Sequence, residues 1–592
     1  MVKERVVRIE RHHVGEAAVS AAHTDFANRI GGQVRSMSRG GRMTTYEWQL
    51  LAEEFLDYLG ALSVETPDLD SPEAKAVLKD ATEAAAGAVA YAAYHPHCSF
   101  HIMLNYVNFG MSYEQGEEEH PEERVTPQEW IDAFCLAILS DKVTWHGEAF
   151  HFARKKFSGN AAEGNPAVEL VGSFMAYVLG DTGDDANYPP SAQEKLTAID
   201  AALARLREQQ EQNGQSLLDH PHTVGLTALR ALAAHDREGF HSALTALLLP
   251  HSALPGPGAQ PRSLLPLLPI ALAALAYRTL GWIPSLDTDY LPRALVTVFE
   301  TAGPRVEGLG RNRRPVAIAA LAAGPLVVER PGRARPLHPE SEAHFEQHTQ
   351  KAITPVDGKP LAVWRLASAL RDQEILFKTR ASHSDDVTDT QLATLRLASQ
   401  LGAALFRIAL AEPGTEAEVT IDGRTLRYPA TRDDAISPGS WETAVNFALI
   451  TGSREDLAPL VLTGPTYSLK DSTAFASYRV ALHDYLRAAD PEPATEKALQ
   501  DVEKAKDWGF VPPPVVLFSQ LVDGDEQSFN LALADALEAH RDHYQVADRA
   551  DDCDAAINLD ILALTCHARR RGWNIQVTSP YLPQRLLRSS VS

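Results

Sequence analysis

Residues 281–292 read GWIPSLDTDYLP, and residues 572–583 read GWNIQVTSPYLP. Each stretch opens with Gly-Trp and closes, at the same spacing, with Tyr-Leu-Pro. An Ala/Leu-rich segment that ends in basic residues precedes both. This order is typical of a helix whose last carbonyl groups face cationic side chains and whose C-terminus is closed by glycine. The match predicts that the chain holds two copies of one unit, and that each copy ends with one of these stretches.

Two further pairs of segments match in the same order along the chain. DREGFHSALTALL from Asp236 pairs with DEQSFNLALADAL from Asp525. In both, apolar residues at i, i+4 and i+8 form one stripe along a predicted helix, and the aspartate is placed to cap it. VTPQEWIDAFCLAIL from Val125 pairs with ISPGSWETAVNFALI from Ile436, where Thr-Pro or Ser-Pro predicts a helix start. Three matches in one order, at nearly constant offset, favour duplication over a chance similarity of helical domains.

A small β-hairpin is expected among the helices of each unit. EVTIDGRTLRY, residues 418–428, alternates apolar and polar residues around Asp-Gly, which is a strong hairpin-turn signal. SFHIMLNYVNFGMSY, residues 99–113, is strand-like but has no such turn. Ala and Leu dominate elsewhere, which favours helices. The sequence therefore predicts a mostly α fold of two tandem helical domains related by internal duplication, each with a small β-hairpin element.

The expected domain limits follow from the repeat and from composition. Residues 1–25 are expected to be a poorly ordered N-terminus, and residues 26–302 form the first, divergent unit. Residues 303–340 contain two stretches rich in Pro, Gly and Arg around the apolar run VAIAALAAGPLVV, and are expected to join the units. Residues 341–592 form the second unit.

Charge and cysteine content limit the possible partners and location. The net charge of the 592-residue chain is −23, which disfavours binding to nucleic acid or to an anionic membrane surface and suits a basic partner. The four cysteines include no CxxC pair, so a reducing cytosol fits better than a disulfide framework. The charged N-terminus lacks the apolar core of a signal peptide. The apolar run from Leu264 to Tyr277 is shorter than the ~20 residues of a membrane helix and is expected to be a buried helix. A cytoplasmic protein is predicted.

No motif predicts catalysis. Phosphate-binding loops, dinucleotide-binding glycine motifs, HExxH and G-x-S-x-G are all absent from the sequence. HPHCSFH, from His95 to His101, offers ligand types that zinc prefers, but no second cluster completes a site. We therefore predict no enzyme, no catalytic residue, no cofactor and no metal. An enzyme with an unrecognised site near His95–His101 stays as an alternative.

Three acidic clusters are candidate partner-binding surfaces. Acidic loops are usually only solvated, but they also dock basic partners and raise the rate of association. None of the three has the residue order of a calcium loop. The candidate residues are Glu117, Glu118, Glu119, Asp181, Asp184, Asp185, Asp548, Asp551, Asp552 and Asp554.

The repeated aromatic residues Trp282, Tyr290, Trp573 and Tyr581 are candidates either for binding anchors or for core packing. Because they recur in both copies, a shared role in holding the fold is the favoured interpretation.

Four segments of the second unit carry a family resemblance. They read SPGSWETAVNFALITG, YSLKDSTAFASYRVALHDYL, PPPVVLFSQLVDGDEQSFNLALADALEAHRDHY and NLDILALTCHARRRGWNIQVTSPYLPQRLL. In this combination, residues 437–588 resemble the immunity protein 49 family of bacterial polymorphic toxin systems. The first unit resembles a divergent copy: it keeps TPQEW and the GW…YLP ending, but has HTVGLTALRALAAHD in place of PPPVVLFSQLVDGD.

The resemblance implies a mostly helical, cytosolic immunity protein that binds and neutralises a cognate toxin, commonly a nuclease, and that has no catalytic residues. The charge of −23 is compatible with a basic toxin domain. A general helical scaffold or adaptor without a toxin partner is the alternative, although short repeats of 34–47 residues, typical of such scaffolds, are absent. The toxin, the interface residues and the oligomeric state stay open at this point.

Overall fold

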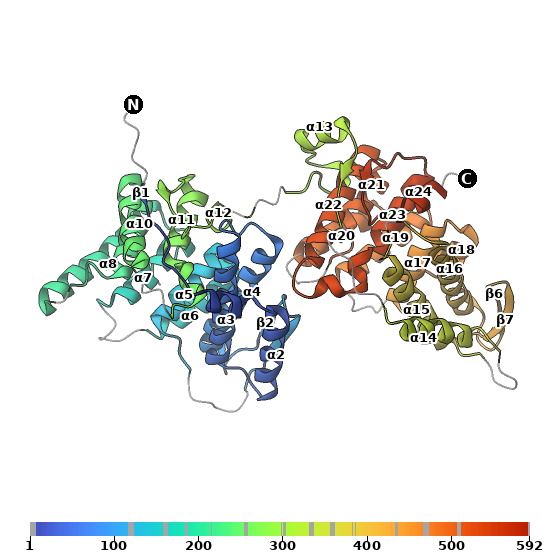
Figure 1. Ribbon diagram of the computed structural model, residues 1–592, viewed down its shortest axis with the longest axis horizontal. Helices are drawn as coiled ribbons and strands as arrows, with labels where there is room; N and C mark the ends of the chain where they lie inside the picture. The colour runs from blue at the N-terminus through green and yellow to red at the C-terminus, as the bar shows by residue number, and fades with distance from the viewer. Residues whose placement is uncertain are drawn as a thin grey trace. The chain divides into compact units, whose positions relative to one another are not determined.

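In the computed structural model, the chain forms two compact units, residues 1–301 (unit 1) and residues 302–592 (unit 2), and each is described by itself (Figure 1). The structure describes the following residues: 7–116, 123–157, 164–183, 188–214, 216–253, 258–297, 299, 303–330, 337–355, 361–381, 383–384, 386–431, 436–465, 473–505 and 511–589.

Unit 1 is mostly helical. Its helices are α1 (Glu16–His23), α2 (Phe26–Arg39), α3 (Thr45–Glu65), α4 (Pro72–Tyr94), α5 (Pro127–Leu139), α6 (Val143–Lys155), α7 (Pro166–Phe174) with the π-helical turn η1 (Met175–Leu179), α8 (Ala192–Asn213), α9 (Pro221–Ala233), α10 (Arg237–Ser252), the 3-10 turn η2 (Pro261–Leu264), α11 (Leu267–Leu280) and α12 (Arg293–Thr297).

Unit 2 repeats this plan. Its helices are the 3-10 turn η3 (Gly308–Gly310), α13 (Pro315–Ala323), α14 (Pro339–Ala352), α15 (Val363–Ala381), α16 (Asp389–Leu410), α17 (Pro438–Thr451), α18 (Arg454–Thr463), α19 (Ala474–Leu486), α20 (Glu492–Ala505), α21 (Val515–Asp523), α22 (Glu526–Tyr544), the 3-10 turns η4 (Arg549–Asp551) and η5 (Cys553–Ala556), α23 (Leu559–Arg570) and α24 (Gln584–Ser589).

Helices α2 to α12 recur in the same order as α14 to α24, which confirms the predicted mostly α fold with duplicated units. Equivalent side chains make equivalent contacts. The indole Nε1 of Trp130 donates to the carbonyl of Phe150 at 3.1 Å, and that of Trp441 donates to the carbonyl of Leu460 at 3.0 Å. Both tryptophans are fully buried, one turn into helices that begin with a serine or threonine cap followed by proline. The predicted helix starts at Thr126 and Ser437 are therefore correct.

Each unit contains a hairpin, as expected. In unit 2, β6 (Glu416–Ile421) pairs with antiparallel β7 (Arg424–Pro429), and Figure 1 shows this hairpin next to α16. Asp422 and Gly423 connect the strands with φ of 51° and 71°, as an Asp-Gly hairpin turn requires. In unit 1, β2 (Phe100–Leu104) pairs with β3 (Phe109–Tyr113) through a longer link that ends at Asn108, where φ is 48°. Asparagine tolerates this left-handed conformation, so the first hairpin forms without an Asp-Gly turn.

A second small sheet joins the beginning of each unit to its end. In unit 1, β1 (Val7–Arg8) lies parallel to β4 (Leu286–Asp287), and in unit 2, β5 (Leu326–Val327) lies parallel to β8 (Val577–Thr578). Both ladders continue by one backbone bond, from Ile9 to Asp287 and from Val328 to Thr578, each 3.0 Å long. In both units this strand precedes the first helix of the repeated series, α2 in unit 1 and α14 in unit 2.

This strand shifts two of the expected domain limits. Residues 7–25, expected to be poorly ordered, contain β1 and α1 and bury Ile9 and His12. Residues 303–330, expected to belong to a joining segment, pack within unit 2, where the Arg305 side chain pairs with Asp535 and Glu538. The signal that would have found the shared strand is short: residues 9–11 read IER and residues 328–330 read VER.

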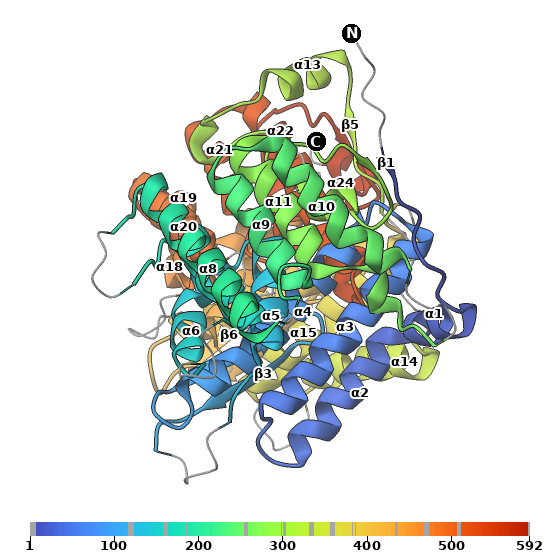
Figure 2. The same cartoon turned by 90° about the vertical axis from the view of Figure 1, so that its left-hand side faces the viewer.

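The apolar run predicted to be a buried helix is the centre of unit 1. Residues Pro261–Leu280 are long and apolar enough to cross a membrane, but most of this stretch is buried inside the unit. Figure 2 shows α9, α10 and α11 packed side by side, and α11 also contacts α5 and α12. Helix α11 is therefore a core helix, as expected, although the apolar helical stretch of 20 residues is longer than the run recognised in the sequence.

Candidate functional site

The structure locates five of the ten acidic residues predicted to bind a partner. Glu117, Glu118, Glu119, Asp184 and Asp185 lie outside the described residues. Asp181 follows the π-helical turn η1, where its carboxylate accepts hydrogen bonds from His151 at 2.5 Å and Arg154 at 2.6 Å. Its charge is therefore balanced inside unit 1.

The remaining four lie in one segment of unit 2, around η4 and η5. Asp548, Asp551 and Asp552 are exposed. The Asp552 carboxylate accepts a hydrogen bond from the backbone N–H of Asp554 at 2.9 Å and so caps η5. Asp554 turns inward and forms an ion pair with Lys378 at 2.6 Å. Three of the four carboxylates are thus accessible to a partner, and the fourth lines a cavity.

The candidate metal ligands are poorly suited to bind a metal ion. Among the described residues, donor atoms of Asp552, Cys553 and Asp554 lie within 4.8 Å of one another. Burial raises the pKa of the Cys553 thiol to about 12, so the sulfur keeps its proton, and the Lys378 ammonium already neutralises Asp554.

The histidines of HPHCSFH do not converge either. The His95 ring stacks on Tyr91 with ring centres 4.6 Å apart and bonds to Arg42. His101 bonds instead to Ser112 across the hairpin, at 3.0 Å. The arrangement of these side chains is that of a turn entering a strand.

The repeated tyrosines belong to the core, and the repeated tryptophans, which are half-buried, pack against it. Tyr290 and Tyr581 are buried. Trp282 packs against Phe240 with ring centres 6.1 Å apart, and Trp573 packs against Phe529 at 5.4 Å. The equivalent contacts explain why the GW…YLP stretch recurs in both copies: it holds the last helices of each unit together.

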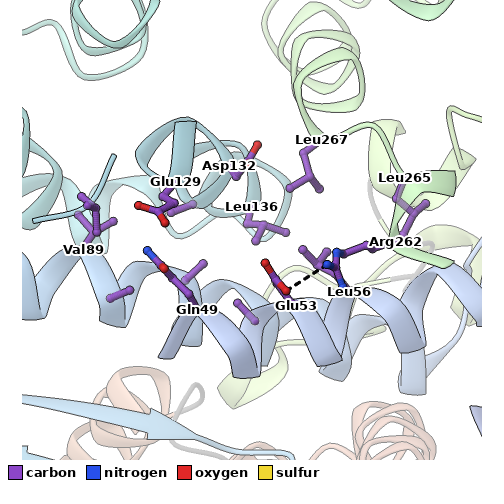
Figure 3. Close-up of a pocket in the computed structure, with 15 residues that line it drawn as sticks. Gln49, Glu53, Leu56, Val89, Glu129, Asp132, Leu136, Arg262, Leu265 and Leu267 are labelled. Carbon is purple, nitrogen blue, oxygen red and sulfur yellow. Dashed lines mark ion pairs between the residues drawn. The ribbon is translucent and has the colours of Figure 1, made fainter. Parts of the chain in front are cut away.

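Each unit also contains a cavity that sequence analysis did not reveal. In unit 1 the cavity measures about 270 Å³ and lies between α3, α4, α5 and the turn η2. Figure 3 shows Gln49, Glu53 and Leu56 on α3 facing Asp132 and other residues of α5 across this space. The residues that line it are Gln49, Ala52, Glu53, Leu56, Ala85, Ala88, Val89, Val125, Glu129, Asp132, Ala133, Leu136, Arg262, Leu265 and Leu267.

The polar groups of this cavity are mostly acidic. Arg262 pairs with Glu53 at 3.1 Å, the contact drawn in Figure 3, and also with Asp57 at 2.6 Å. Asp132 accepts two hydrogen bonds from the Gln128 amide, and burial raises the pKa of Asp132 to about 6. Three carboxyl groups, those of Glu53, Asp132 and the capping residue Glu129, thus line the cavity together with one guanidinium, that of Arg262. The cavity has an apolar floor and a surplus of negative charge.

Unit 2 has a cavity of about 250 Å³ at the corresponding junction, bounded by α15, α17 and η5 together with α19 and α22. Its lining is more highly charged. The residues are Glu374, Lys378, Gly439, Glu442, Thr443, Asn446, Phe475, Arg479, His540, Tyr544, Asp554, Ile557, Asn558, Leu559 and Asp560.

Ion pairs organise the charged groups of the second cavity. Lys378 bridges Glu374, at 2.5 Å, and Asp554. Arg479 pairs with Glu442 at 2.6 Å. Asp560 accepts a hydrogen bond from the Asn446 amide at 2.6 Å.

Glu442 and Asp560 form a coupled carboxyl pair in this cavity. Burial, together with the neighbouring Asp560 carboxylate, raises the pKa of Glu442 to about 8, and burial likewise raises the pKa of Asp560. Two carboxyl groups this close ionise one after the other, so the pair retains one proton near neutral pH.

Comparison with known proteins decides the family. The model of the family described as Immunity protein 49 matches residues 67–295 and 384–586, which together cover more than half of the chain. This chain belongs to the Immunity protein 49 family. Neither the curated proteins nor the solved structures contain a match.

The two matched segments are structurally equivalent. One runs from just before α4 into α12, and the other from just before α16 into α24. Both units are therefore Immunity protein 49 units, and the resemblance found in the sequence is confirmed. Membership of an immunity family means that the chain neutralises a toxin, and it supports the prediction that the chain is not an enzyme.

The two Immunity protein 49 units differ at their cavities. Arg11 bonds to the carbonyl of Ser63 as Arg330 bonds to that of Ala381, which places Gly60 and Lys378 at equivalent positions, three residues earlier. A Cβ atom on Gly60 would lie 2.1 Å from the carbonyl oxygen of Pro261, because η2 packs directly on α3. In unit 2 the lysine side chain fills that junction. The ion pair between helix and turn reverses its polarity accordingly, since the acid is on the helix in unit 1 and on the turn in unit 2.

Proposed function

We propose that this chain neutralises a basic toxin domain of the nuclease class by binding it directly in the cytoplasm. The observation that carries the proposal is that both units present a cavity with surplus negative charge. Nucleases that bind phosphate backbones present cationic grooves, and an acidic protein can occupy such a groove. The net charge of −23 and the exposed carboxylates of Asp548, Asp551 and Asp552 support the same partner chemistry.

Direct binding of a basic toxin predicts a specific effect of salt on the association and dissociation rates, which other routes to immunity do not predict. Attraction between an acidic and a basic surface accelerates encounter and is screened by salt, whereas the dissociation rate depends on short-range packing. The association rate constant should therefore fall at least tenfold between about 50 and 300 mM NaCl, while the dissociation rate changes much less.

The test uses the toxin domain encoded next to this protein. Surface plasmon resonance at the two salt concentrations measures both rates, and a nuclease assay with equimolar protein measures inhibition. We expect complete inhibition at a 1:1 ratio and a steep salt dependence of association. A toxin that stays fully active with this chain in excess would refute the proposal, and an inhibited toxin without nuclease activity would refute its assignment to the nuclease class.

A further inference from the structure

The cavity of unit 2 has the size for one side chain. Its volume of about 250 Å³ lies below the roughly 300–1,000 Å³ of sites for small-molecule ligands. Phe475, Ile557 and Leu559 supply apolar walls, and the charged groups lie among them. Such a lining suits a long side chain with an apolar stem and a charged end.

The charges inside this cavity do not balance. The four carboxyl groups are those of Glu374, Glu442, Asp554 and Asp560, and the two cations are Lys378 and Arg479. Lys378 forms ion pairs with Glu374 and Asp554, and Arg479 forms an ion pair with Glu442. Asp560 accepts a hydrogen bond from the neutral Asn446 amide and is hydrogen-bonded to Glu442, so ionisation of both carboxyl groups would leave one negative charge at this pair without a cation.

The only donor that reaches one oxygen of this pair is the shared proton. Glu442 is 8% exposed, its Oε2 is paired with Arg479, and its buried Oε1 has no N–H donor among the described residues, so its donor is the proton that Glu442 shares with Asp560. A buried carboxylate oxygen is unfavourable unless a proton or a cation reaches it. An incoming cation can therefore take the place of the shared proton.

We infer that this cavity is a pocket for the guanidinium group of one arginine of the bound toxin, held between the carboxylates of Glu442 and Asp560. The inference rests on the proposed function, because a basic toxin supplies the arginine. A guanidinium offers several N–H donors in one plane and can serve two carboxylates at once, which an ammonium group does less well.

Unit 1 lacks this pair. Glu442 follows Trp441, and the residue that follows the equivalent Trp130 is Ile131. Asp560 precedes Gly572 by twelve residues, and Pro269 precedes Gly281 by the same number. The acidic pair is therefore particular to unit 2, and this unit is the one that anchors the arginine.

Uptake of the guanidinium is linked to a proton. The pair holds one proton when the pocket is empty, and a cation between the carboxylates favours the form in which both are ionised, so the proton leaves to solvent. Burial lowers the pKa of His540 to about 4, so this ring stays neutral throughout. Binding should therefore strengthen as pH rises from about 6.5 to 8.5. The titratable and charged groups around the pair are Glu374 and Lys378 on α15, Arg479 and Tyr478 on α19, His540 and Tyr544 on α22, and Asp554 at η5.

The first experiment uses the full chain and n-butylguanidinium as the probe. Saturation-transfer NMR should detect binding of this cation and none of n-butylurea, its neutral analogue of the same shape. Glu442→Gln and Asp560→Asn should each weaken binding at least tenfold. Glu340→Gln removes the carboxylate of a side chain that is 92% exposed and lies outside every proposed binding surface, and it should leave binding unchanged.

The native chain provides a measurement that needs no variant. Calorimetry in two buffers of different ionisation enthalpy should show release of up to one proton per bound probe below about pH 8, and tighter binding at pH 8.5 than at pH 6.5. The inference would be overturned by any of three results: n-butylurea binds as well as n-butylguanidinium, both pocket variants bind the probe with native affinity, or the probe binds without proton release.

The toxin separates this inference from the proposed function. If native protein inhibits the toxin and Glu442→Gln binds the toxin at least tenfold more weakly, the proposed function and the pocket inference are both supported. If the variants retain native affinity for an inhibited toxin, the pocket inference alone fails. If native protein does not inhibit the toxin, the proposed function fails, and probe binding still decides whether the pocket accepts a guanidinium.

Discussion

The guanidinium of Arg330 lies 6.0 Å from the centre of the Tyr581 ring, as that of Arg11 lies 5.9 Å from the ring of Tyr290. Arg330 also donates hydrogen bonds to the carbonyls of Ala381, at 3.2 Å, and Ala556, at 2.9 Å. One side chain therefore connects the first strand of unit 2 to the end of α15 and to η5.

Arg330→Ala should destabilise unit 2 by about 2–4 kcal/mol, because charge-assisted bonds to two carbonyl groups are lost. Urea unfolding of the full chain gives the free energy of unfolding, and hydrogen–deuterium exchange mass spectrometry assigns the loss to a unit. Arg427→Ala is the control, since Arg427 is 69% exposed and forms only a surface pair with Glu418. Protection lost equally in unit 1 would contradict the prediction.

Trp441→Phe should destabilise unit 2 by about 2 kcal/mol, because the carbonyl of Leu460 loses its indole donor and a small void remains. Trp364→Phe is the matched control, since Trp364 is 51% exposed. Thermal unfolding followed by circular dichroism compares the two variants. An equal change in melting temperature for both would show that burial of Trp441 is not the cause.

Gly60→Ala should destabilise unit 1 by about 1–3 kcal/mol, because the backbone of η2 must move away from α3. Gly172→Ala, in helix α7 with no atom within 4 Å of the new Cβ, should instead be neutral or stabilising by up to about 1 kcal/mol. The free energy of unfolding of each variant checks the pair. If the two variants were equally stable, the backbone of η2 could move away from α3 without loss of stability, and the prediction would be wrong.

The stability of unit 2 should fall as pH rises through the neutral range. Below the ordinary pKa of 4.5, Glu442 is protonated in the folded and the unfolded chain. Above it, the unfolded chain ionises while folded Glu442 retains its proton until about pH 8, so the unfolded state gains stability with rising pH. Between pH 5.5 and 8.5, native unit 2 should lose about 1 kcal/mol or more relative to Glu442→Gln. Urea unfolding at the two pH values measures this, and parallel curves for both proteins would contradict it.

Much of the fold could be predicted from the sequence because helix starts and ends carry local signals. The caps at Thr126 and Ser437 and the glycines that close α11 and α23 are defined by adjacent residues. The strands β1 and β5 could not be predicted in this way. Each is a two-residue strand whose partner lies far along the chain, and the shared IER and VER are too short to stand out.

The candidate site could be predicted less well. Sequence clusters identified acids that are near one another along the chain, and one of these, Asp554, does line a cavity. Glu442 and Asp560 are 118 positions apart and lie on predicted helices, where nothing local indicates that they meet. Their proximity follows from the packing of α17 against α23, which only the folded unit reveals.

The pairing of β1 with β4, and of β5 with β8, also bears on how such a chain arises. Because each unit brings its own first and last strands together, the repeated part of the unit begins and ends at one place. A gene segment that encodes one unit can then be copied in frame and joined head to tail by a short link, without disturbing the interior of either copy. Each copy then keeps its own interior, so the acidic residues at the two cavities can differ between the copies while the fold is retained.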